Sequence, residues 1–223
     1  ALFQTIKEAG FKVALTGEGA DEFFGGYTRF ATAANDTQPN WLNTYLDKLS
    51  AATKSQRDEL YSDDYHHFLQ TQTTLSQKIF DEIKARELKS SNRLQTLLEF
   101  DQLDRFPYYI LRRVDHLSMA HSVEVRVPFC QPKIISLSRQ MPNAYKIANS
   151  QTKHVLYKAA HDKLPSSILS RPKQPFLLPI AAMLKKGHVL FELLIDTIFS
   201  ESFKNRCIFN TRGIECLLKK QLD

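Results

Sequence analysis

Long apolar runs, paired cysteines and metal-binding histidine patterns are all missing from this 223-residue chain. No run approaches the roughly 20 apolar residues that span a bilayer, which argues against a membrane-spanning helix. The three cysteines, Cys130, Cys207 and Cys216, show no Cys-x-x-Cys spacing, which favours a reduced protein without structural zinc. None of the seven histidines has His-x-x-x-His spacing. The start of the chain has no secretory signal pattern, so we predict a cytoplasmic protein.

A strongly basic surface is also absent. The formal net charge is +6, and the bases occur as short pairs rather than as a stripe interleaved with aromatic residues. This distribution does not favour nucleic-acid binding. A modest basic excess suits an anionic small substrate.

The periodicity of apolar residues predicts a mostly α-helical chain with one clear strand, residues 11–16. A lone strand leaves its backbone groups unpaired, so we expect its partners to lie outside this chain. Residues 123–128 alternate apolar and charged residues, which predicts a short extended segment. Pro107 is expected to break a helical pattern in two. Helices are predicted over residues 2–9, 27–34, 41–54, 131–140, 152–163, 180–198 and 212–221.

The run from Gly17 to Gly26 is the most informative segment. Its sequence, Gly-Glu-Gly-Ala-Asp-Glu-Phe-Phe-Gly-Gly, follows the predicted strand directly. Ligands of parallel α/β sheets bind beyond the carboxyl ends of strands, and acids there can hold Mg²⁺. A solvated acidic turn is the alternative interpretation. The run is not a P-loop, because no Gly-Lys-Ser/Thr follows.

Three segments, in this order, carry a family resemblance. They are Leu15-Thr-Gly-Glu-Gly-Ala-Asp-Glu-Phe-Phe-Gly-Gly-Tyr27, Ile110-Leu-Arg-Arg-Val-Asp-His-Leu-Ser-Met-Ala-His-Ser-Val-Glu-Val-Arg-Val-Pro-Phe129 and Arg171-Pro-Lys-Gln-Pro-Phe176. Together they resemble the C-terminal part of the synthetase domain of glutamine-dependent asparagine synthetases. The resemblance covers residues 1–223 and implies an α/β parent fold with a Rossmann-type sheet, as in adenine nucleotide α-hydrolases.

The resemblance implies an ATP-dependent ligase that adenylates the side-chain carboxylate of aspartate, with ammonia from glutamine as the attacking group. ATP and Mg²⁺ are the implied cofactors, and a homodimer is left open. Asp21 matches the family's Mg²⁺ ligand, whereas Glu18 and Lys173 match its catalytic residues. Gly17, Glu18, Gly19, Asp21 and Lys173 would form the cofactor-binding set. Glu18 is expected either to transfer a proton or to orient the substrate.

Two further residues have less specific expectations. Arg113 and Asp115 are expected near the substrate, or as an ion pair that shapes the site. Glu22 is expected to be an acid near a helix N-terminus, where it complements the helix dipole.

The sequence also departs from the family pattern. The Ser-Gly-Gly-x-Asp-Ser pyrophosphate-loop motif and the glutaminase domain are absent, so this chain alone is expected to be incomplete for activity. Cys130 and Gln131 replace a usual Leu-Asp, Tyr108 and Tyr109 replace an acidic pair, and Pro175 replaces a glycine. Adenylation of another carboxylate therefore remains an alternative, as in polysaccharide amidotransferases, β-lactam synthetases or lasso-peptide cyclases. A degenerate, non-catalytic module is the third hypothesis.

Overall fold

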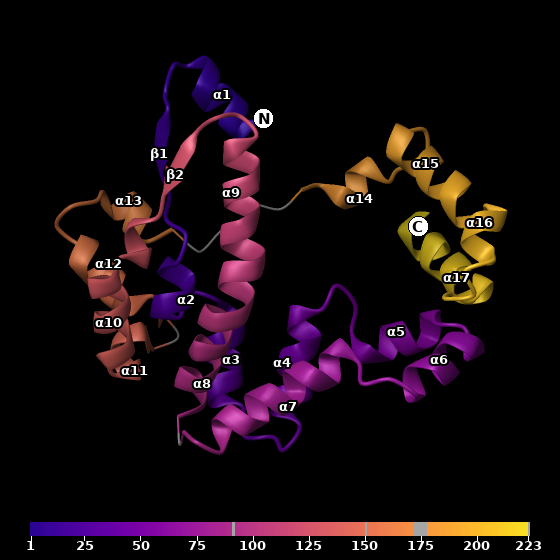
Figure 1. The fold of residues 1–223 in the computed structure, drawn as a ribbon, viewed down its shortest axis with the longest axis horizontal. Helices are drawn as coiled ribbons and strands as arrows, with labels where there is room; N and C mark the ends of the chain where they lie inside the picture. The colour runs from indigo at the N-terminus through magenta and orange to yellow at the C-terminus, as the bar shows by residue number, and fades with distance from the viewer. Residues whose placement is uncertain (91, 150, 172–177, 223) are drawn as a thin grey trace. The chain divides into compact units, whose positions relative to one another are not determined.

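The computed structural model describes residues 1–223 except 91, 150, 172–177 and 223, and it divides into two compact units (Figure 1). The first unit comprises Ala1–Tyr45 and Phe80–Arg171, and the second comprises Leu46–Ile79 and Pro172–Asp223. The two boundaries near residues 45 and 79 fall inside helices α4 (Trp41–Leu49) and α7 (Leu75–Glu87).

The first unit is mostly helical, in agreement with the sequence-based prediction. Besides parts of α4 and α7, its helices are α1 (Leu2–Glu8), α2 (Ala20–Phe24), α3 (Thr28–Asn35), α8 (Arg93–Phe100), α9 (Arg112–Met119), α10 (Pro132–Gln140), α11 (Asn143–Lys146), α12 (His154–Ala160) and α13 (Ser166–Leu169). The predicted helices 2–9, 27–34 and 131–140 are confirmed almost to the residue, whereas α4 ends before the predicted residue 54.

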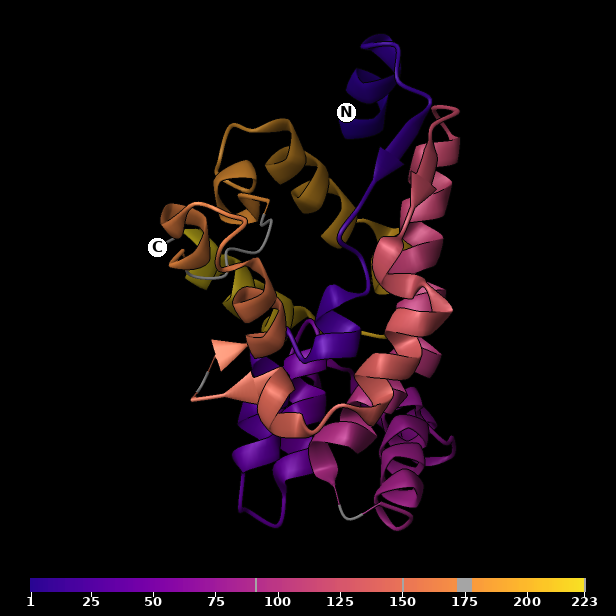
Figure 2. The ribbon, with the colours of Figure 1, turned by 90° about the vertical axis from the view of Figure 1, so that its left-hand side faces the viewer.

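The predicted strand has a partner within this chain, contrary to our expectation. Strand β1 (Val13–Leu15) pairs in parallel with β2 (Glu124–Arg126), with Val13 opposite Glu124 and Leu15 opposite Arg126. The partner is the segment that the sequence predicted only to be extended. Strand β2 lies beside α9, and β1 lies next to β2 (Figure 2). Because the strands are parallel, the segments that follow them leave the strand pair at the same end.

A second, antiparallel strand pair was not predicted from the sequence. Strand β3 (Ile147–Ala148) pairs with β4 (Gln151–Thr152), with Ile147 opposite Thr152. With two residues in each strand, the pair is too short to show an apolar alternation. Strand β4 is followed, after Lys153, by α12.

Pro107 does not break the helix, so that prediction was wrong. A π-helix, Asp101–Leu111, contains Pro107 and connects α8 to α9 without an interruption. The residues at its two ends, Phe100 and Arg112, both have right-handed helical backbone angles. In a π-helix the hydrogen bonds join residues five apart, and both proline and π-helical turns occur where the regular α-helical bonding is interrupted.

An apolar cluster in the first unit holds the Gly17–Gly26 run against this long helix. Phe23 and Phe24 of α2 pack with Phe106 and Ile110 of the π-helix, and all four side chains are buried. Phe23 meets Phe106 edge-on, with the ring centroids 5.6 Å apart. The partly buried residues packed around the cluster come from the end of the π-helix, the segment after β2, α10 with the residue that follows it, and α12: Leu111, Phe129, Cys130, Ile134, Ile135, Met141, Val155 and Leu156.

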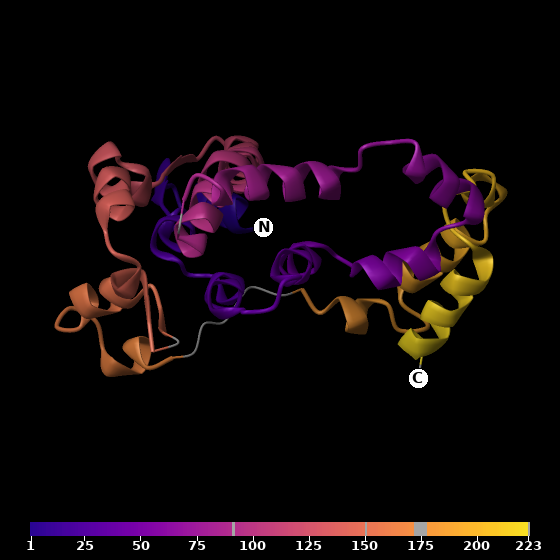
Figure 3. The same cartoon turned by 90° about the horizontal axis from the view of Figure 1, so that it is seen from below.

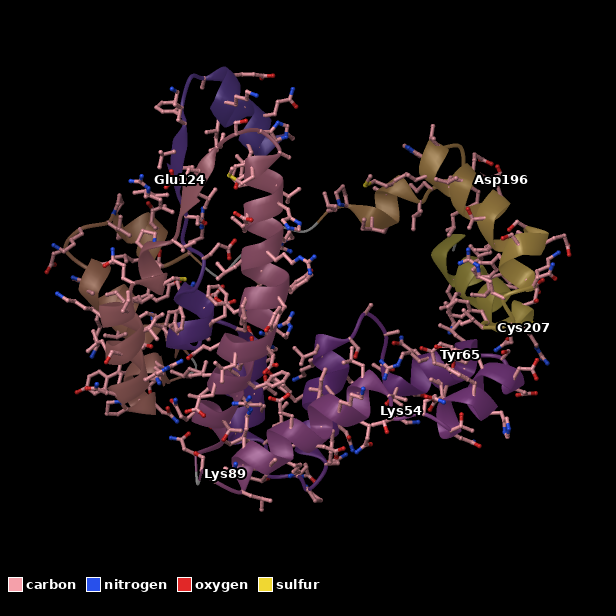
Figure 4. All side chains as sticks on the ribbon, viewed as in Figure 1. Lys54, Tyr65, Lys89, Glu124, Asp196 and Cys207 are labelled. Atoms are coloured by element: carbon pink, nitrogen blue, oxygen red, sulfur yellow. The ribbon has the colours of Figure 1, made fainter. Side chains whose placement is uncertain are left out.

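The second unit consists of short helices. Besides parts of α4 and α7, they are α5 (Lys54–Leu60), α6 (Asp63–Gln70), α14 (Ile180–Met183), α15 (Val189–Ile198), α16 (Glu201–Lys204) and α17 (Thr211–Leu222). The single helix predicted over 180–198 is two helices, separated at Gly187, whose φ of +86° suits glycine alone. Helix α5 lies beside α17 (Figure 3), and Tyr65 of α6 and Cys207 are both in this unit (Figure 4).

Over the described residues, no helix combines the length and apolar character that crossing a membrane requires.

Candidate functional site

The Gly17–Gly26 run begins where β1 ends. The Thr16 amide donates a hydrogen bond to the Arg126 carbonyl at 3.0 Å, which extends the strand pairing by one residue. The chain then enters Gly17-Glu18-Gly19 and turns into α2. Gly19 and Gly25, on either side of α2, have φ of +91° and +68°. These left-handed angles explain why glycines flank so short a helix.

Glu18 is half-buried at the carboxyl end of β1. Burial raises the pKa of its carboxyl above the ordinary value, the Arg113 guanidinium acts to lower that pKa, and the Asp21 carboxylate acts to raise it. The Glu18 carboxyl therefore interacts electrostatically with both Asp21 and Arg113. The structure thus brings together residues of the first two sequence motifs.

Asp21 is fixed from two sides. Its Oδ1 lies 2.8 Å from Nζ of Lys153, and both side chains are largely shielded from solvent. On the other side it lies against Gly26, where a Cβ would come within 1.8 Å of the same oxygen. Only glycine at position 26 leaves room for the Asp21 carboxylate.

Glu22 lies in the first turn of α2, as expected, but it is also buried, with a relative exposure of 1%. The Tyr27 hydroxyl donates a hydrogen bond to its Oε1 at 2.5 Å. Burial raises the pKa of the Glu22 carboxyl, and the Tyr27 hydrogen bond opposes that increase. The Glu22 carbonyl accepts a hydrogen bond from Nε2 of Gln102 at 3.1 Å. Glu22 therefore anchors α2 to the π-helix.

Arg113 and Asp115 are both exposed on α9. Arg113 rests on the Tyr109 ring, 5.0 Å from its centroid, and donates a hydrogen bond from Nη1 to the Tyr109 hydroxyl at 3.4 Å. Within the described part of the chain, Arg113 and Asp115 form no ion pair with each other. Residues two apart on a helix point in different directions, which explains why they do not.

The remaining predicted residues differ in what the structure says about them. Lys173 lies outside the described residues, so its predicted role is untested. Gly17 is exposed, and a Cβ there would meet nothing within 4 Å. Packing therefore gives no reason for glycine at position 17, whereas at Gly19 a Cβ would come within 3.1 Å of the Phe23 ring.

Cys130, one of the departures from the family pattern, lies beside the Gly17–Gly26 run. Its Sγ would be 3.2 Å from a Cβ added to Gly19. Burial, and then the negative charges of Glu22 and Glu18, raise the pKa of the Cys130 thiol to about 11. At neutral pH the thiol is protonated, so it acts as a small apolar group against the loop rather than as a nucleophile.

Sequence reasoning missed two residues that shape the site, Lys153 and Gly26. Lys153 belongs to no motif in the sequence. Its own backbone has left-handed angles, and its side chain reaches the Asp21 carboxylate. Gly26 was noted only as part of a glycine pair. The Gly25-Gly26 pair, four to five residues after Asp21, was a signal that could have identified the contact between Gly26 and the Asp21 carboxylate.

The donor set suits a metal that is shared with a ligand. Among the residues whose placement is described, no group of three or more His, Cys, Asp or Glu side chains converges as a metal site. Mg²⁺ commonly takes only one or two carboxylates and completes its shell with water and substrate phosphates. Asp21, in the first turn of the helix that follows β1, could supply one such carboxylate.

Comparisons with known proteins identify the family of this chain. The Asparagine synthase family model matches residues 1–223, so the chain belongs to this family. A putative asparagine synthetase [glutamine-hydrolyzing] of Mycobacterium bovis is 29% identical over 217 residues, which cover 85% of this chain and 33% of the relative. Asparagine synthetase [glutamine-hydrolyzing] 3 of Bacillus subtilis is 30% identical over 166 residues, covering 74% of this chain and 26% of the relative.

A more distant relative comes from a eukaryote. A probable asparagine synthetase [glutamine-hydrolyzing] of Dictyostelium discoideum is 25% identical over 187 residues, or 78% of this chain and 24% of the relative. The chain thus spans about a third or less of the length of these curated relatives. No solved structure matches the chain.

Proposed function

We propose that the complete protein to which these residues belong forms an amide bond at the expense of ATP. It would adenylate the side-chain carboxylate of aspartate, and ammonia from glutamine would then displace AMP. The observation that carries the proposal is the half-buried Glu18 carboxyl just after β1, which interacts electrostatically with both Asp21 and Arg113, in a chain of the Asparagine synthase family. This chain would supply one part of the site, and segments outside it would supply the remainder.

Positioning and electrostatics dominate nucleotidyl transfer, so each residue is assigned by the charge it can present. Asp21 would hold Mg²⁺ together with the nucleotide phosphates. The bound metal would neutralise negative charge on the departing pyrophosphate. Gly17, which no packing contact constrains, would let the nucleotide approach the backbone closely.

Glu18 would act on the reacting groups. Its raised pKa brings the carboxyl closer to neutrality than an exposed glutamate, which suits proton transfer at the amide-forming step. Arg113 and Asp115 would lie near the substrate, and Arg113 would keep the Glu18 carboxylate available. Lys173 is proposed, on the motif alone, to stabilise negative charge on the α-phosphate.

A second candidate is the same chemistry on a different carboxylate. The observation that favours it is the position of two departures from the family pattern: Tyr109 supports Arg113, and Cys130 lies against the Gly19 loop. Contacts in the binding pocket decide which substrate an enzyme favours, so changes close to Arg113 and Gly19 would suit a different carboxylate. A non-catalytic module is disfavoured because Glu18 and Asp21 are both retained next to each other.

Exchange of radiolabelled pyrophosphate into ATP, measured on the complete protein with and without aspartate, tests the proposal. Exchange that depends on aspartate would support the first candidate. Exchange that requires another acid in a substrate panel would support the second. If no acid supports exchange, the catalytic interpretation is wrong.

A further inference from the structure

Lys153 occupies an unusual backbone position. It is the residue before α12 and follows β4, with φ of +52° and ψ of +33°. Residues other than glycine, asparagine and aspartate rarely adopt this left-handed conformation, which costs energy unless the surroundings enforce it. Here the short β3–β4 pair fixes the chain just before Lys153.

The same chain segment packs on the far end of the Gly17–Gly26 run. A Cβ on Gly25 would lie 3.1 Å from Cγ1 of Ile147, the first residue of β3. Val155 and Leu156 of α12 pack on the cluster that contains Phe23 and Phe24. The segment that carries Lys153 is thus anchored to the segment that carries Asp21, and the distance between their side chains is set by packing.

The Asp21 carboxylate is consequently held between a cation and a backbone. Lys153 Nζ lies 2.8 Å from Oδ1, with the two side chains 22% and 24% exposed. Gly26 lies against the same oxygen, since any Cβ there would collide with it. A divalent cation that reached Asp21 would add two positive charges beside the ammonium group. The resulting repulsion opposes binding of the bare ion.

We propose that Lys153 is a positioning residue that acts as the counter-ion of Asp21 and keeps bare divalent cations off this carboxylate, so that the metal binds there only together with nucleotide phosphates. The inference rests on the proposed function for the identity of the metal. Phosphates supply the negative charge that allows a divalent cation and the Lys153 ammonium to occupy the same neighbourhood. The Lys153–Asp21 ion pair thereby prevents the metal from binding before the nucleotide, so that the two bind as one complex.

Binding of Mn²⁺ to the complete protein without nucleotide, followed by electron paramagnetic resonance, tests this directly. Lys153→Met removes the charge while keeping a long side chain, and we expect the Mn²⁺ Kd to fall at least tenfold below that of the wild type. Lys153→Arg keeps the charge and is expected to behave as the wild type. Lys158→Met is the matched control, because Lys158 is exposed on the same helix.

The double variant Lys153→Met/Asp21→Asn assigns the new site. We expect it to lose the tighter Mn²⁺ binding, since the asparagine amide is a weaker ligand than a carboxylate. Lys153→Asn is measured in parallel, because asparagine tolerates left-handed backbone angles and also removes the charge. Loss of folding in one neutral variant therefore does not remove the test.

Two results would overturn the proposal. One is an unchanged Mn²⁺ Kd in the folded neutral variants, and the other is tighter binding that survives Asp21→Asn. Mn²⁺ binding without nucleotide is independent of catalysis, so failure of pyrophosphate exchange in the wild type would reject the proposed function without affecting this result. Conversely, normal exchange with an unchanged Mn²⁺ Kd would reject the role of Lys153 alone.

Discussion

The two units of this chain differ in how their side chains are buried. The first unit contains the apolar cluster around Phe23 and Phe106, together with buried charged and polar side chains such as Glu22 and Asp101. In the second unit, Phe191 is the one hydrophobic side chain of the described residues that is buried. Every described candidate site residue lies in the first unit. A site that must hold its groups within a fraction of an ångström needs the more rigid support.

In the second unit, α5, α6 and α16 each begin with a side-chain cap. Thr53 and Gln56 form a capping box at the start of α5, and Ser62 and Ser200 cap α6 and α16. Phe203 and Phe209 stack with their centroids 5.6 Å apart. Units with few buried apolar groups open at lower free energy than packed cores. We therefore expect faster hydrogen exchange in the second unit, and the following predictions test this contrast.

The largest effect is expected from Arg29→Met in the first unit. Arg29 pairs with Asp101, which is fully buried, and lies 3.8 Å from the centroid of the Tyr27 ring. Removing one partner of a buried pair typically costs about 3–5 kcal/mol. Arg105, 3.7 Å from the same carboxylate, compensates in part, so we expect a loss of about 3 kcal/mol in the free energy of unfolding.

Urea unfolding, with hydrogen exchange read from α3 and α8, measures this loss. Arg126→Met is the control, because the Arg126–Glu124 pair at 2.9 Å is exposed on β2, where Figure 4 labels Glu124. An exposed pair contributes about 1 kcal/mol or less. Equal losses in the two variants would mean that the Arg29–Asp101 pair does not stabilise the core.

Gly26→Ala is expected to reduce pyrophosphate exchange about a hundredfold, which corresponds to about 2.7 kcal/mol in the barrier. The added methyl group would displace the Asp21 carboxylate, which lies where that group must go. Gly213→Ala is the matched variant in the second unit, where a Cβ would come within 2.8 Å of the Glu59 carbonyl oxygen. Equal losses of exchange in both variants would contradict the assignment of the chemistry to the first unit.

The sequence predicted the elements that depend on local pattern and motif. The strand after Gly10 and the helices 2–9, 27–34 and 131–140 were predicted correctly. The family assignment, made from three motifs, is confirmed. These features reside in short stretches of sequence, where periodicity and residue type carry the information.

Contacts between distant segments could not be read in this way. Two features depend on residues far apart in the chain: the pairing of β1 with β2 and the ion pair of Lys153 with Asp21. The continuous helix through Pro107 depends on helix geometry that composition does not specify. Gly187 was visible in the sequence, and its break in the helix predicted over 180–198 was overlooked. A residue with left-handed backbone angles, such as Gly187, rarely occurs in the interior of an α-helix.

A smaller effect is expected from Asn210→Ala in the second unit. Its Nδ2 donates to the carbonyls of Glu59 at 2.7 Å and Tyr61 at 3.1 Å, and its Oδ1 accepts from the Gly213 amide at 2.5 Å. Losing these bonds is expected to cost about 1–2 kcal/mol. Hydrogen exchange should rise in α5 and α17 and stay unchanged in α8. Asn205→Ala, at an exposed position, is the control, and a rise that spreads to α8 would show that the two units unfold together.

The smallest effect is expected from Arg113→Met, read as the pH dependence of pyrophosphate exchange. Burial already raises the pKa of Glu18, and Arg113 acts to lower it. Without the guanidinium, the Glu18 pKa rises further, so the carboxylate becomes protonated at a higher pH. If exchange requires the carboxylate, its acidic limb moves to higher pH, by a small amount because Arg113 is exposed and solvent screens its charge.

Arg112→Met provides the control, since Arg112 is the exposed neighbour on α9 and does not contribute to the Glu18 pKa. A shift of the acidic limb in Arg113→Met alone would assign that limb to Glu18 and favour proton transfer over simple orientation of the substrate. A reduced rate with an unchanged profile would favour orientation instead. A shift to lower pH would contradict the electrostatic contact between Arg113 and Glu18, and with it the convergence on which the proposed site depends.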